Sequence, residues 1–599
     1  MNENSIFSYI KSQEAGYNLP IRLTDAWEWS MKEHITLTTL YSNSQLKTGK
    51  NDYKPVKNIT RPILNLQHRT EDLELKDVQI YVDDSDKYHL SFLVKKYHDD
   101  VFVRENDIDT FLDELNVQRI DMGGGLSKKL NRPRPEVVPL ESIAFCDQTD
   151  ILSGPIGIKH FYSPDQLLEM KDVGWGDKSK GATHTVEEAI ALSREEKQND
   201  SSSQGTVMNK TPGRYVEVYE VHGNLPKSYF DKNDKSGEYE TRMCIVCFYQ
   251  TKGSDEKKGI VLYSAIETES PFKLIKRDPV YGRALGFGGA EELFEPQVWI
   301  NYDMIRVQKM LDAAAVTVLT SSDPAIAARH PSGLKNLKNL EVIDGGQEND
   351  LRQVDTFPRN IALFEKSVSN WEAHAQQMGA ANDSIMGEPP TAGTPFKLQE
   401  LVTAESHGLH DYRRGQFAKH IEEIYTDWII PHIQKEITKG AKFLSELLLE
   451  ELQYVTESVA INQTNQMVKD KILSGEMITQ EEIDAYKQVV TETFKKKGNK
   501  HFIEILKDEF KNAPLAVKVS VAGKSKNLAQ RVDKLVNIFR QVATNPAILQ
   551  IPAMGGLFNQ IIEASGLDPV DFASITKEQI AATQQPVPSP MQPEMMTNV

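Results

Sequence analysis

The sequence predicts an α+β chain in which a region of short strands precedes a region of long helices. From about residue 61 to 275, short runs of β-branched and aromatic residues alternate with polar turn clusters, which is the pattern of strands joined by turns. Beyond Gly289 the chain carries much longer helix-compatible runs. At roughly 150 residues per domain, the 599 residues predict about four structural units.

The strand-rich region contains five runs with strand composition. They cover residues 78–82, 88–94, 215–221, 244–249 and 259–263. A Gly123-Gly-Gly turn and the polar stretch 195–206 interrupt them, and we expect the polar stretch to form a surface loop. The first 60 residues are polar with scattered aromatic side chains, so we expect an arm there rather than a domain.

Two helices of the second region flank a loop-rich insert. The first is predicted over 291–319, with Pro296 in its first turn, where the missing N–H needs no partner. A run of roughly 25 to 30 residues makes a rod of about 40 Å. The insert over 321–357 is rich in proline and glycine, and the second helix follows over 358–378. We therefore expect two antiparallel helices with the insert projecting from one end.

A third, longer helix follows a Gly/Pro-rich loop at 384–395. Thr394 and Pro395 supply an N-cap and a proline at the first helical position, and the helix is predicted over 396–439 with a kink at Pro431. The remaining elements are helices over 443–469, 479–497 and 501–511, a strand over 515–521, and helices over 527–542 and 557–564. Residues 584–599 are rich in Pro, Gln and Met and are predicted to be disordered.

The net charge is −17, which excludes a polybasic surface for nucleic acid or membranes. With 39% hydrophobic and 26% charged residues, the composition is that of a soluble globular protein. The N-terminus lacks a secretory signal and no apolar run is long enough to span a membrane. We therefore expect synthesis in a cytoplasm.

Three cysteines cannot build a disulfide framework, which agrees with a reducing compartment. Cys244 and Cys247 form a CxxC inside a predicted strand, where positions i and i+3 point to opposite faces. We expect buried structural cysteines; a zinc or redox site is the alternative.

Two glycine motifs and one histidine pair invite functional interpretations. Gly523-Lys524-Ser525 lies between a predicted strand and a helix, as in a P-loop, but Lys518 occupies the place of the required first glycine. In Gly286-Phe-Gly-Gly289 the third glycine of a dinucleotide fingerprint is replaced by Glu291, so a hinge before the helix is favoured. His407 and His410 have the spacing to share a metal, and solvated or packing histidines are the alternative.

Catalytic motifs are otherwise absent. The sequence has no HExxH and no Gly-x-Ser-x-Gly, and its carboxylates are too evenly spread to single out an acid–base pair. We therefore expect no enzyme activity, cofactor or metal.

The segment from Pro271 to Asn301 resembles the start of the stem in portal proteins of tailed bacteriophages. In both, an apolar-Gly-x-Gly pattern, here Leu285 to Gly288, leads into a glutamate-rich turn and then a helix carrying a glutamine and an asparagine, here Gln297 and Asn301. The resemblance continues in order over about residues 270–540.

This resemblance implies a portal-like α+β subunit with the parts of that family. The implied parts are an arm (1–60), a β-rich wing (61–288), stem helix 1 (289–320), a clip (321–357), stem helix 2 (358–383), a tunnel loop (384–395), a long wing helix (396–440), a helical crown (441–583) and a disordered tail (584–599).

It also implies a function. Portal proteins are dodecameric rings at one capsid vertex, through which DNA is packaged and ejected. The implied partners are eleven further copies, the large terminase subunit, head–tail adaptor and tail proteins, the major capsid protein, a scaffold protein, and double-stranded DNA that passes without specific contacts. The implied location is the virion, after synthesis in the host cytoplasm.

Three groups of site residues follow from the same resemblance. The tunnel loop that reaches toward DNA consists of Met386, Gly387, Glu388, Pro389, Pro390, Thr391, Ala392 and Gly393. A basic group in the clip, for partner docking or simply solvated, consists of Arg329, His330, Lys335 and Lys338. The stem packing residues, either between subunits or inside one, are Trp299, Tyr302, Ile305, Leu311, Leu363, Phe364 and Trp371.

Two other classes of function remain open from the sequence. One is a nucleotide-dependent enzyme or motor built on Gly523 to Ser525, and the other is a helical adaptor protein that is not a portal. The mass of the particle in solution distinguishes these classes from a ring.

Overall fold

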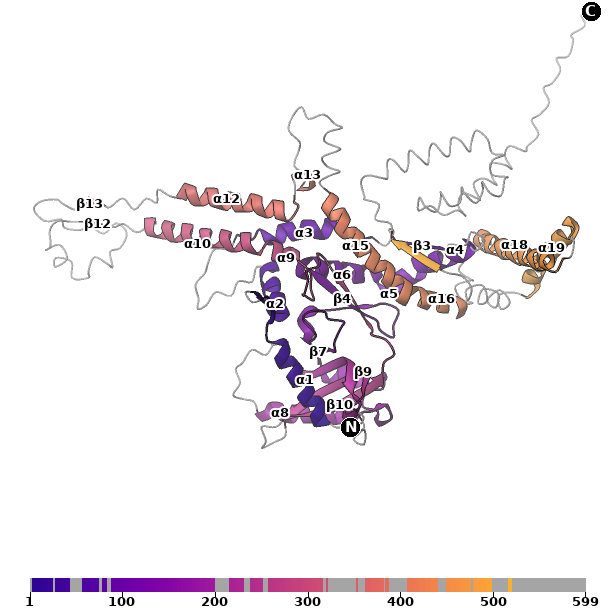
Figure 1. Ribbon diagram of the computed structural model, residues 1–599, viewed down its shortest axis with the longest axis horizontal. Coiled ribbons are helices and arrows are strands. Elements are labelled where there is room, and N and C mark those ends of the chain that lie inside the picture. The colour runs from indigo at the N-terminus through magenta and orange to yellow at the C-terminus, as the bar shows by residue number, and fades with distance from the viewer. Residues whose placement is uncertain are drawn as a thin grey trace, which may run out of the picture. The chain divides into compact units, whose positions relative to one another are not determined.

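The chain is α+β, with helices and antiparallel sheets in the computed structural model (Figure 1). The structure describes residues 3–24, 27–43, 57–74, 78–82, 88–199, 215–230, 237–250, 257–315, 319–320, 352–353, 361–381, 383–386, 407–439, 449–475, 478–497 and 515–519. It divides into two compact units, of which unit 1 comprises residues 1–71, 115–126 and 138–410, and unit 2 the remainder.

The N-terminal residues are part of the core of unit 1, so the expectation of a separate arm is wrong for the described part. The elements are α1 (Glu3–Tyr17), β1 (Ile21–Thr24), β2 (Trp27–Trp29) and α2 (Met31–Ser42). Ile6 and Ile10 of α1, and Met31 and Ile35 of α2, recur four residues apart and are buried. This i, i+4 spacing gives each helix an apolar stripe that packs inward.

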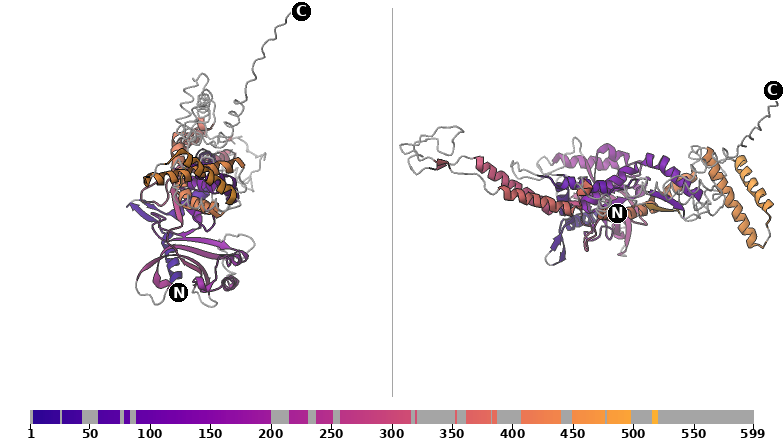
Figure 2. Two further views of the ribbon diagram at one scale, coloured as in Figure 1. Left: turned by 90° about the vertical axis from the view of Figure 1, so that its right-hand side faces the viewer. Right: turned by 90° about the horizontal axis from the view of Figure 1, so that it is seen from above.

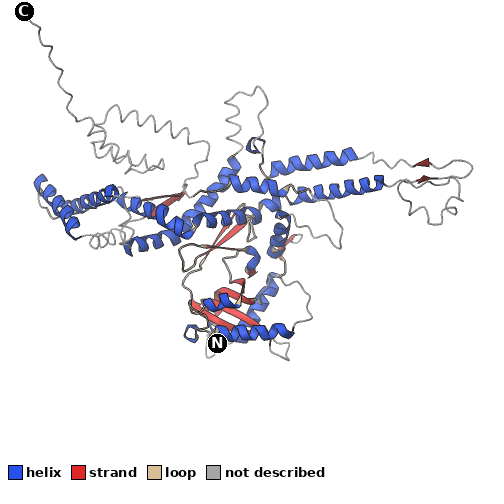
Figure 3. Cartoon of the chain, turned by 180° about the vertical axis from the view of Figure 1, so that it is seen from behind, coloured by secondary structure: helices blue, strands red, loops and turns tan. Residues whose placement is uncertain are grey.

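Unit 1 contains a five-stranded antiparallel sheet, whose strands are among those drawn in red in Figure 3. The order β10-β9-β8-β7-β6 comprises β10 (Lys257–Ile266), β9 (Tyr239–Gln250), β8 (Val216–Pro226), β7 (Ile156–Tyr162) and β6 (Ile143–Phe145). One face packs on α1, and the other carries α7 (Pro164–Glu169) and α8 (Val186–Asn199). The strands predicted over 215–221, 244–249 and 259–263 are confirmed.

The two cysteines of the CxxC lie on opposite faces of this sheet. Cys244 belongs to the core beneath α1, and Cys247 to the core beneath α7 and α8. Cys244 and Cys247 are both buried, and burial raises the pKa of the Cys244 thiol to about 12, so they are structural cysteines.

The prediction of a loop over 195–206 is wrong for its first five residues, because α8 continues through them to Asn199.

Shorter elements complete this part of the chain. They are β4 (Gly124–Lys128), β5 (Glu136–Val138) and β11 (Phe272–Lys276), which form a sheet of order β11-β4-β5, and the 3-10 turns η4 (Leu140–Ser142), η5 (Lys178–Lys180) and η6 (Lys227–Tyr229). Of the predicted Gly123-Gly-Gly turn, only Gly123 precedes β4, and the next two glycines belong to the strand. Gly123 has a φ of +79°, a conformation that favours glycine.

The helical part of unit 1 is built around α10 and α12. Its elements are α3 (Thr60–Thr70), α9 (Gly289–Glu292), α10 (Phe294–Ala315), α12 (Ile361–Met378) and α13 (Asp383–Met386). Pro296 lies in the first turn of α10, as predicted. Beyond the helices, β12 (Leu319–Thr320) pairs antiparallel with β13 (Arg352–Gln353) at the two ends of the insert.

Unit 2 packs helices on a two-stranded sheet. Its elements are β3 (Val78–Val82), α4 (Tyr88–Tyr97), the π-helix η3 (His98–Phe102), α5 (Val103–Asn106), α15 (Gly408–Ile424), the π-helix η8 (Tyr425–Ile429), α16 (Ile430–Lys439), α18 (Leu449–Leu473), α19 (Gln480–Lys497) and β14 (Leu515–Val519). Strand β14 pairs antiparallel with β3. Two helices contribute residues to both units: α6 (Ile108–Met122), and α15, whose residues 408–410 belong to unit 1.

The predicted strand at 88–94 is wrong, because these residues form α4. Leu90, Val94, His98 and Phe102 are all buried and recur every four residues, which is a helical period. The seven-residue window that predicted a strand was too short to show this period.

Of the long helix predicted over 396–439, residues 396–406 lie outside the described residues, and the rest is helical from Gly408 to Lys439. Within it, the π-helical turn η8 separates α15 from α16 and ends two residues before Pro431. Helices α18 and α19 and strand β14 confirm three further predictions. Residues 501–511, 527–542, 557–564 and 584–599 and the Gly523-Lys524-Ser525 motif lie outside the described residues. No described helix combines the length and the apolarity that a membrane span requires.

Candidate subunit interface on the paired helices

Helices α10 and α12 lie side by side and run antiparallel, as the upper left of Figure 1 and the view from above in Figure 2 both show. Three contacts tie them together: Trp299 with Trp371, Asp303 with Ser367, and Arg306 with Phe364. Residue numbers rise along α10 while they fall along α12. The prediction that these two helices run antiparallel is therefore confirmed, while most of the insert between them lies outside the described residues.

The base of this hairpin is buried against α3. The core there consists of Ile59, Ile63, Leu64, Ile120, Ala290, Leu293, Ile300, Val368, Ala375 and Ala381. Gln297 of α10 adds polar contacts: its Oε1 accepts from the backbone N–H groups of Ile59 and Thr60, at 2.9 and 3.2 Å. Its Nε2 donates to the Asn301 side chain over 2.9 Å. Both polar residues of the stem motif thus have a structural role at the base.

One side of the hairpin carries a continuous group of aromatic rings and one arginine, which we call the aromatic seam: Trp299, Tyr302, Arg306, Phe364 and Trp371. The indoles of Trp299 and Trp371 stack with centroids 6.2 Å apart, and Tyr302 meets Trp299 edge to face. The Arg306 guanidinium lies over the Tyr302 ring, with Cζ 4.1 Å from its centroid, at a distance typical of cation–π contacts.

The aromatic seam is only partly covered. Trp299 is 42% exposed and Tyr302 48% exposed, although both project from a helix whose opposite side packs in a core. Leu363, which directly precedes Phe364 in the sequence, is 67% exposed. Large apolar side chains gathered on one surface in this way mark an interaction site more often than isolated ones do.

The other side of α12 carries three small residues together with the exposed Lys366. Ala362, Ser369 and Ala373 are exposed, and at 100° per residue they lie about 160–180° around the helix from Trp371. We call these three residues the small flank. Small side chains let a neighbouring chain approach closely and leave room for bulky groups.

Asp303 and Ser367 form the polar contact in the middle of the hairpin. The Ser367 hydroxyl donates to Oδ2 of Asp303 over 2.7 Å, and Asp303 is 5% exposed. Arg306 Nη1 lies 3.7 Å from the other oxygen of the same carboxylate. This arrangement satisfies a buried charge and fixes the register of the two helices.

The chain has been compared with proteins of known family and structure. No protein family model and no curated protein matches it. Solved structures of a gene transfer agent, a virion-like particle, contain similar chains. One, from the virion of the native particle, is 10% identical with a TM-score of 0.26, and the match covers 80% of this chain and 98% of that one. Another, from the neck of the empty particle, is 11% identical with a TM-score of 0.27 and covers 78% and 99%. At these TM-scores neither likeness shows a shared fold.

The seven predicted stem packing residues are all in α10 and α12, but the structure groups only some of them. Trp299, Tyr302, Phe364 and Trp371 meet in the aromatic seam. Ile305 is half-buried and is turned about 120° from Trp299 on α10. Leu311 is 47% exposed near the end of α10.

Sequence reasoning did not predict Arg306, Asp303 or Ser367 in this site. Arg306 follows Tyr302 by four residues, which places the two side chains together on one helical face, and this spacing is the signal that identifies it. Asp303 and Ser367 are partners across two helices, and no sequence spacing reveals such a pair.

The other predicted site residues receive different outcomes. Met386 ends α13 and is 36% exposed, whereas tunnel-loop residues Gly387 to Gly393 lie outside the described residues, as do Arg329, His330, Lys335 and Lys338 of the clip. His410 is fully buried and contacts Glu71 and the Ala380 carbonyl, so it is a packing histidine. Among the described residues, no cluster of metal-ligating side chains occurs.

Proposed function

We propose that the chain is a portal-type subunit that assembles into a closed ring, a structural component without catalytic activity. The aromatic seam and the small flank carry this proposal. They lie on different sides of one hairpin and have unlike shapes, so the seam of one copy complements the small flank of the next and not a second seam. A contact between two different surfaces is heterologous, and heterologous contacts close into a ring when the rotation between neighbouring copies closes.

The chemistry of the aromatic seam supports a second copy as its partner. Trp and Tyr are enriched among the residues that dominate the binding energy of interfaces, and Trp299 and Tyr302 are the half-exposed members of the seam. Ala362, Ser369 and Ala373 leave room for these rings. Both surfaces are present on every copy of the chain, so assembly needs no other protein.

The overall charge supports a conduit for DNA. Twelve copies carry twelve times −17, or −204, formal charges. A wall with the same sign of charge as the phosphates gives moving DNA no deep binding site. We propose that double-stranded DNA passes through the ring without specific contacts, during packaging and ejection.

Further roles in this proposal belong to segments beyond the helices. Residues 386–393 act as the loop that reaches the DNA, and Arg329, His330, Lys335 and Lys338 dock partners. The antiparallel pairing of β12 and β13 supports a projecting insert that carries these basic residues. The proposed partners are the terminase large subunit, head–tail adaptor and tail proteins, the major capsid protein and a scaffold protein. The proposed location is a capsid vertex of the virion, after synthesis in the host cytoplasm.

Light scattering on a size-exclusion column tests the proposal. A ring of twelve subunits has a mass of twelve times 67.6 kDa, about 811 kDa, and negative-stain images should show a central hole. A species that stays monomeric from low to high salt and at increasing protein concentration contradicts ring formation. Tight ATP binding that Lys524→Ala abolishes would instead favour a nucleotide-dependent motor.

A further inference from the structure

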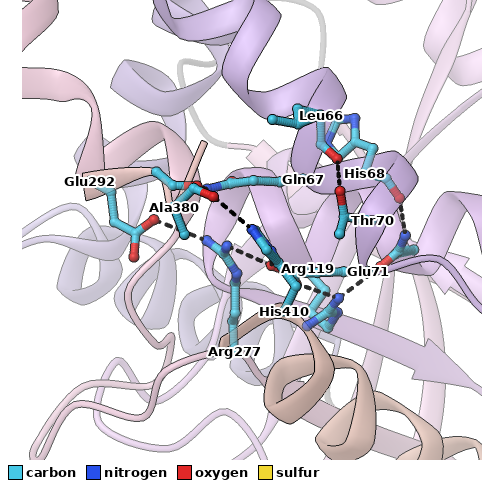
Figure 4. A network of polar contacts seen from close by, with 12 residues as sticks. Leu66, Gln67, His68, Thr70, Glu71, Arg119, Arg277, Glu292, Ala380 and His410 are labelled. Atoms are coloured by element: carbon cyan, nitrogen blue, oxygen red, sulfur yellow. Dashed lines mark hydrogen bonds and ion pairs between the residues drawn. The ribbon is translucent and has the colours of Figure 1, made fainter. Parts of the chain in front are cut away.

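Glu71 is the centre of a buried network of charged side chains in unit 1 (Figure 4). It follows the last turn of α3, and its side chain is 0% exposed. Arg119 Nη2 donates to its Oε2 over 2.9 Å, and Arg277 Nη2 donates to its Oε1 over 3.0 Å. His410 Nδ1 lies 3.2 Å from the same Oε1. We call these four residues the Glu71 hub.

The Glu71 carboxylate is charged in this environment. Burial alone raises the pKa of a carboxyl group, but the Arg277 and Arg119 charges and the His410 hydrogen bond outweigh it and hold the pKa of Glu71 well below its usual range. A buried carboxylate with several cationic partners has a strong preference for one geometry, because each displaced partner leaves an uncompensated charge.

The hairpin has two legs, of which the first is α10 with the short helix α9 before it and the second is α12. The Glu71 hub contacts the first leg through Arg277. The second guanidinium nitrogen of this arginine, Nη1, lies 3.5 Å from Oε2 of Glu292. Glu292 belongs to α9, which leads directly into α10. The position of α9 is therefore tied to Glu71 by one arginine that is itself fully buried.

It reaches the second leg through His410. The other ring nitrogen of His410, Nε2, lies 3.2 Å from the carbonyl oxygen of Ala380, two residues beyond α12. A parallel contact comes from α3 itself: Gln67, one helical turn before Glu71, donates from Nε2 to the Gly379 carbonyl over 3.0 Å. The end of α12 is thus held by the hub and by α3.

At both attachments the backbone of a glycine lies close to a side chain of α3. A Cβ atom on Gly289 in α9 would lie 2.4 Å from Oε1 of Gln67, and one on Gly379 would lie 2.4 Å from Cγ2 of Ile63. Both legs of the hairpin therefore touch α3, the helix that precedes Glu71.

We propose that the Glu71 hub is a mechanical joint that sets the positions of α9, the end of α12 and the first residues of α15, up to His410, together. One carboxylate holds three segments that are far apart in the sequence. Displacement of one segment is transmitted to the others through Glu71. This coupling is a property of the subunit and does not depend on ring formation.

Hydrogen exchange of the full-length protein tests the joint. Glu71→Gln keeps the shape of the side chain and removes its charge, so Arg119 and Arg277 lose the counter-charge that Glu71 supplies. We expect exchange to accelerate about tenfold or more at the amides of Glu292 and Leu293 and also at those of Gly379 and Ala381, because both legs lose their anchor. Amides of β8 and β9 should keep their protection. The matched control is Glu365→Gln, an exposed glutamate on α12, which should change neither leg.

A second variant separates transmission through Glu71 from loss of a local contact. His410→Phe retains a ring and removes both polar contacts, while the pairs of Glu71 with Arg119 and Arg277 remain. It should accelerate exchange at Gly379 and Ala381 and leave Glu292 and Leu293 unchanged. The joint is refuted if Glu71→Gln loosens one leg only, or if His410→Phe loosens both legs equally. If Glu71→Gln does not fold, the His410→Phe pattern alone decides between these outcomes.

Discussion

The indole rings of Trp299 and Trp371 stack across α10 and α12, with their planes 10° from parallel. The two residues come from opposite ends of the hairpin sequence, and the antiparallel course of the helices brings them together. Trp299 remains 42% exposed in this pair. The intramolecular stack therefore uses only part of the ring, and the rest is available to a second copy.

Trp299→Ala should weaken ring assembly while the subunit stays folded. The exposed part of an aromatic anchor at an interface typically contributes about 2 kcal/mol or more, so the assembly midpoint should move to a protein concentration at least tenfold higher. Analytical ultracentrifugation over a concentration series measures this shift, and circular dichroism checks the fold.

Trp27→Ala is the matched control for this experiment. Trp27 is 45% exposed in β2 of the same unit and lies outside the hairpin. Its replacement should leave assembly unchanged. Equal effects of the two substitutions would show that the seam has no special role in association.

Ser367→Ala should destabilise the hairpin. The substitution removes the hydroxyl that donates to the buried Asp303 carboxylate over 2.7 Å, and a buried acceptor that loses its partner costs about 1–3 kcal/mol. Chemical denaturation of the full chain measures the loss. Ser369→Ala, on the exposed small flank of the same helix, should cost little. A neutral Ser367→Ala would mean that Arg306 alone satisfies Asp303.

The hairpin could be predicted from the sequence, because the signals that define it lie within or next to its two helices. Pro296 identifies a first turn, helix-compatible runs give the lengths, and the loop-rich insert between them requires the helices to reverse direction. The alternation of β9 likewise predicted that Cys244 and Cys247 lie on opposite faces, as the two cores confirm.

Contacts between distant segments could not be predicted from the sequence. Glu71, Arg119, Arg277 and His410 are one acid among 86 acidic residues, two of 69 basic residues and one of 14 histidines, and their spacing carries no motif. Only the fold brings them together. The failure at 88–94 has another cause, since strand and helix periods are hard to distinguish within seven residues.

The stability of unit 1 should depend on pH through His222. Burial opposes the charged ring, but hydrogen bonds with Glu220 and Glu267 outweigh it and raise the pKa of His222 above its ordinary value. The folded state therefore binds this proton more tightly than the unfolded state. The stabilisation is complete below about pH 6.5, the ordinary value of histidine, and is lost as the pH rises through the raised pKa of the folded state.

Thermal unfolding between pH 5.5 and 9 measures this dependence. His222→Gln should remove the part of the pH profile that falls above pH 6.5, a change on the order of a few degrees in Tm. Glu267→Gln removes one of the two carboxylates that raise the pKa of His222, so the decline should be smaller and should end at a lower pH. Parallel profiles for the wild type and His222→Gln would exclude His222 as the titrating group.

Two glycine substitutions should have effects of opposite sign. Gly123 has a φ of +79°, and a Cβ atom there would lie 2.4 Å from the Gly286 carbonyl oxygen. Gly123→Ala combines a left-handed backbone with a clash against main-chain atoms that cannot move aside, and should cost about 3 kcal/mol. Gly415 lies inside α15 with no atom within 4 Å of an added Cβ, so Gly415→Ala should stabilise its helix by about 1 kcal/mol. Denaturant midpoints measure both. A tolerated Gly123→Ala would mean that the backbone contact between the Gly123 turn and Gly286 is looser than its geometry indicates.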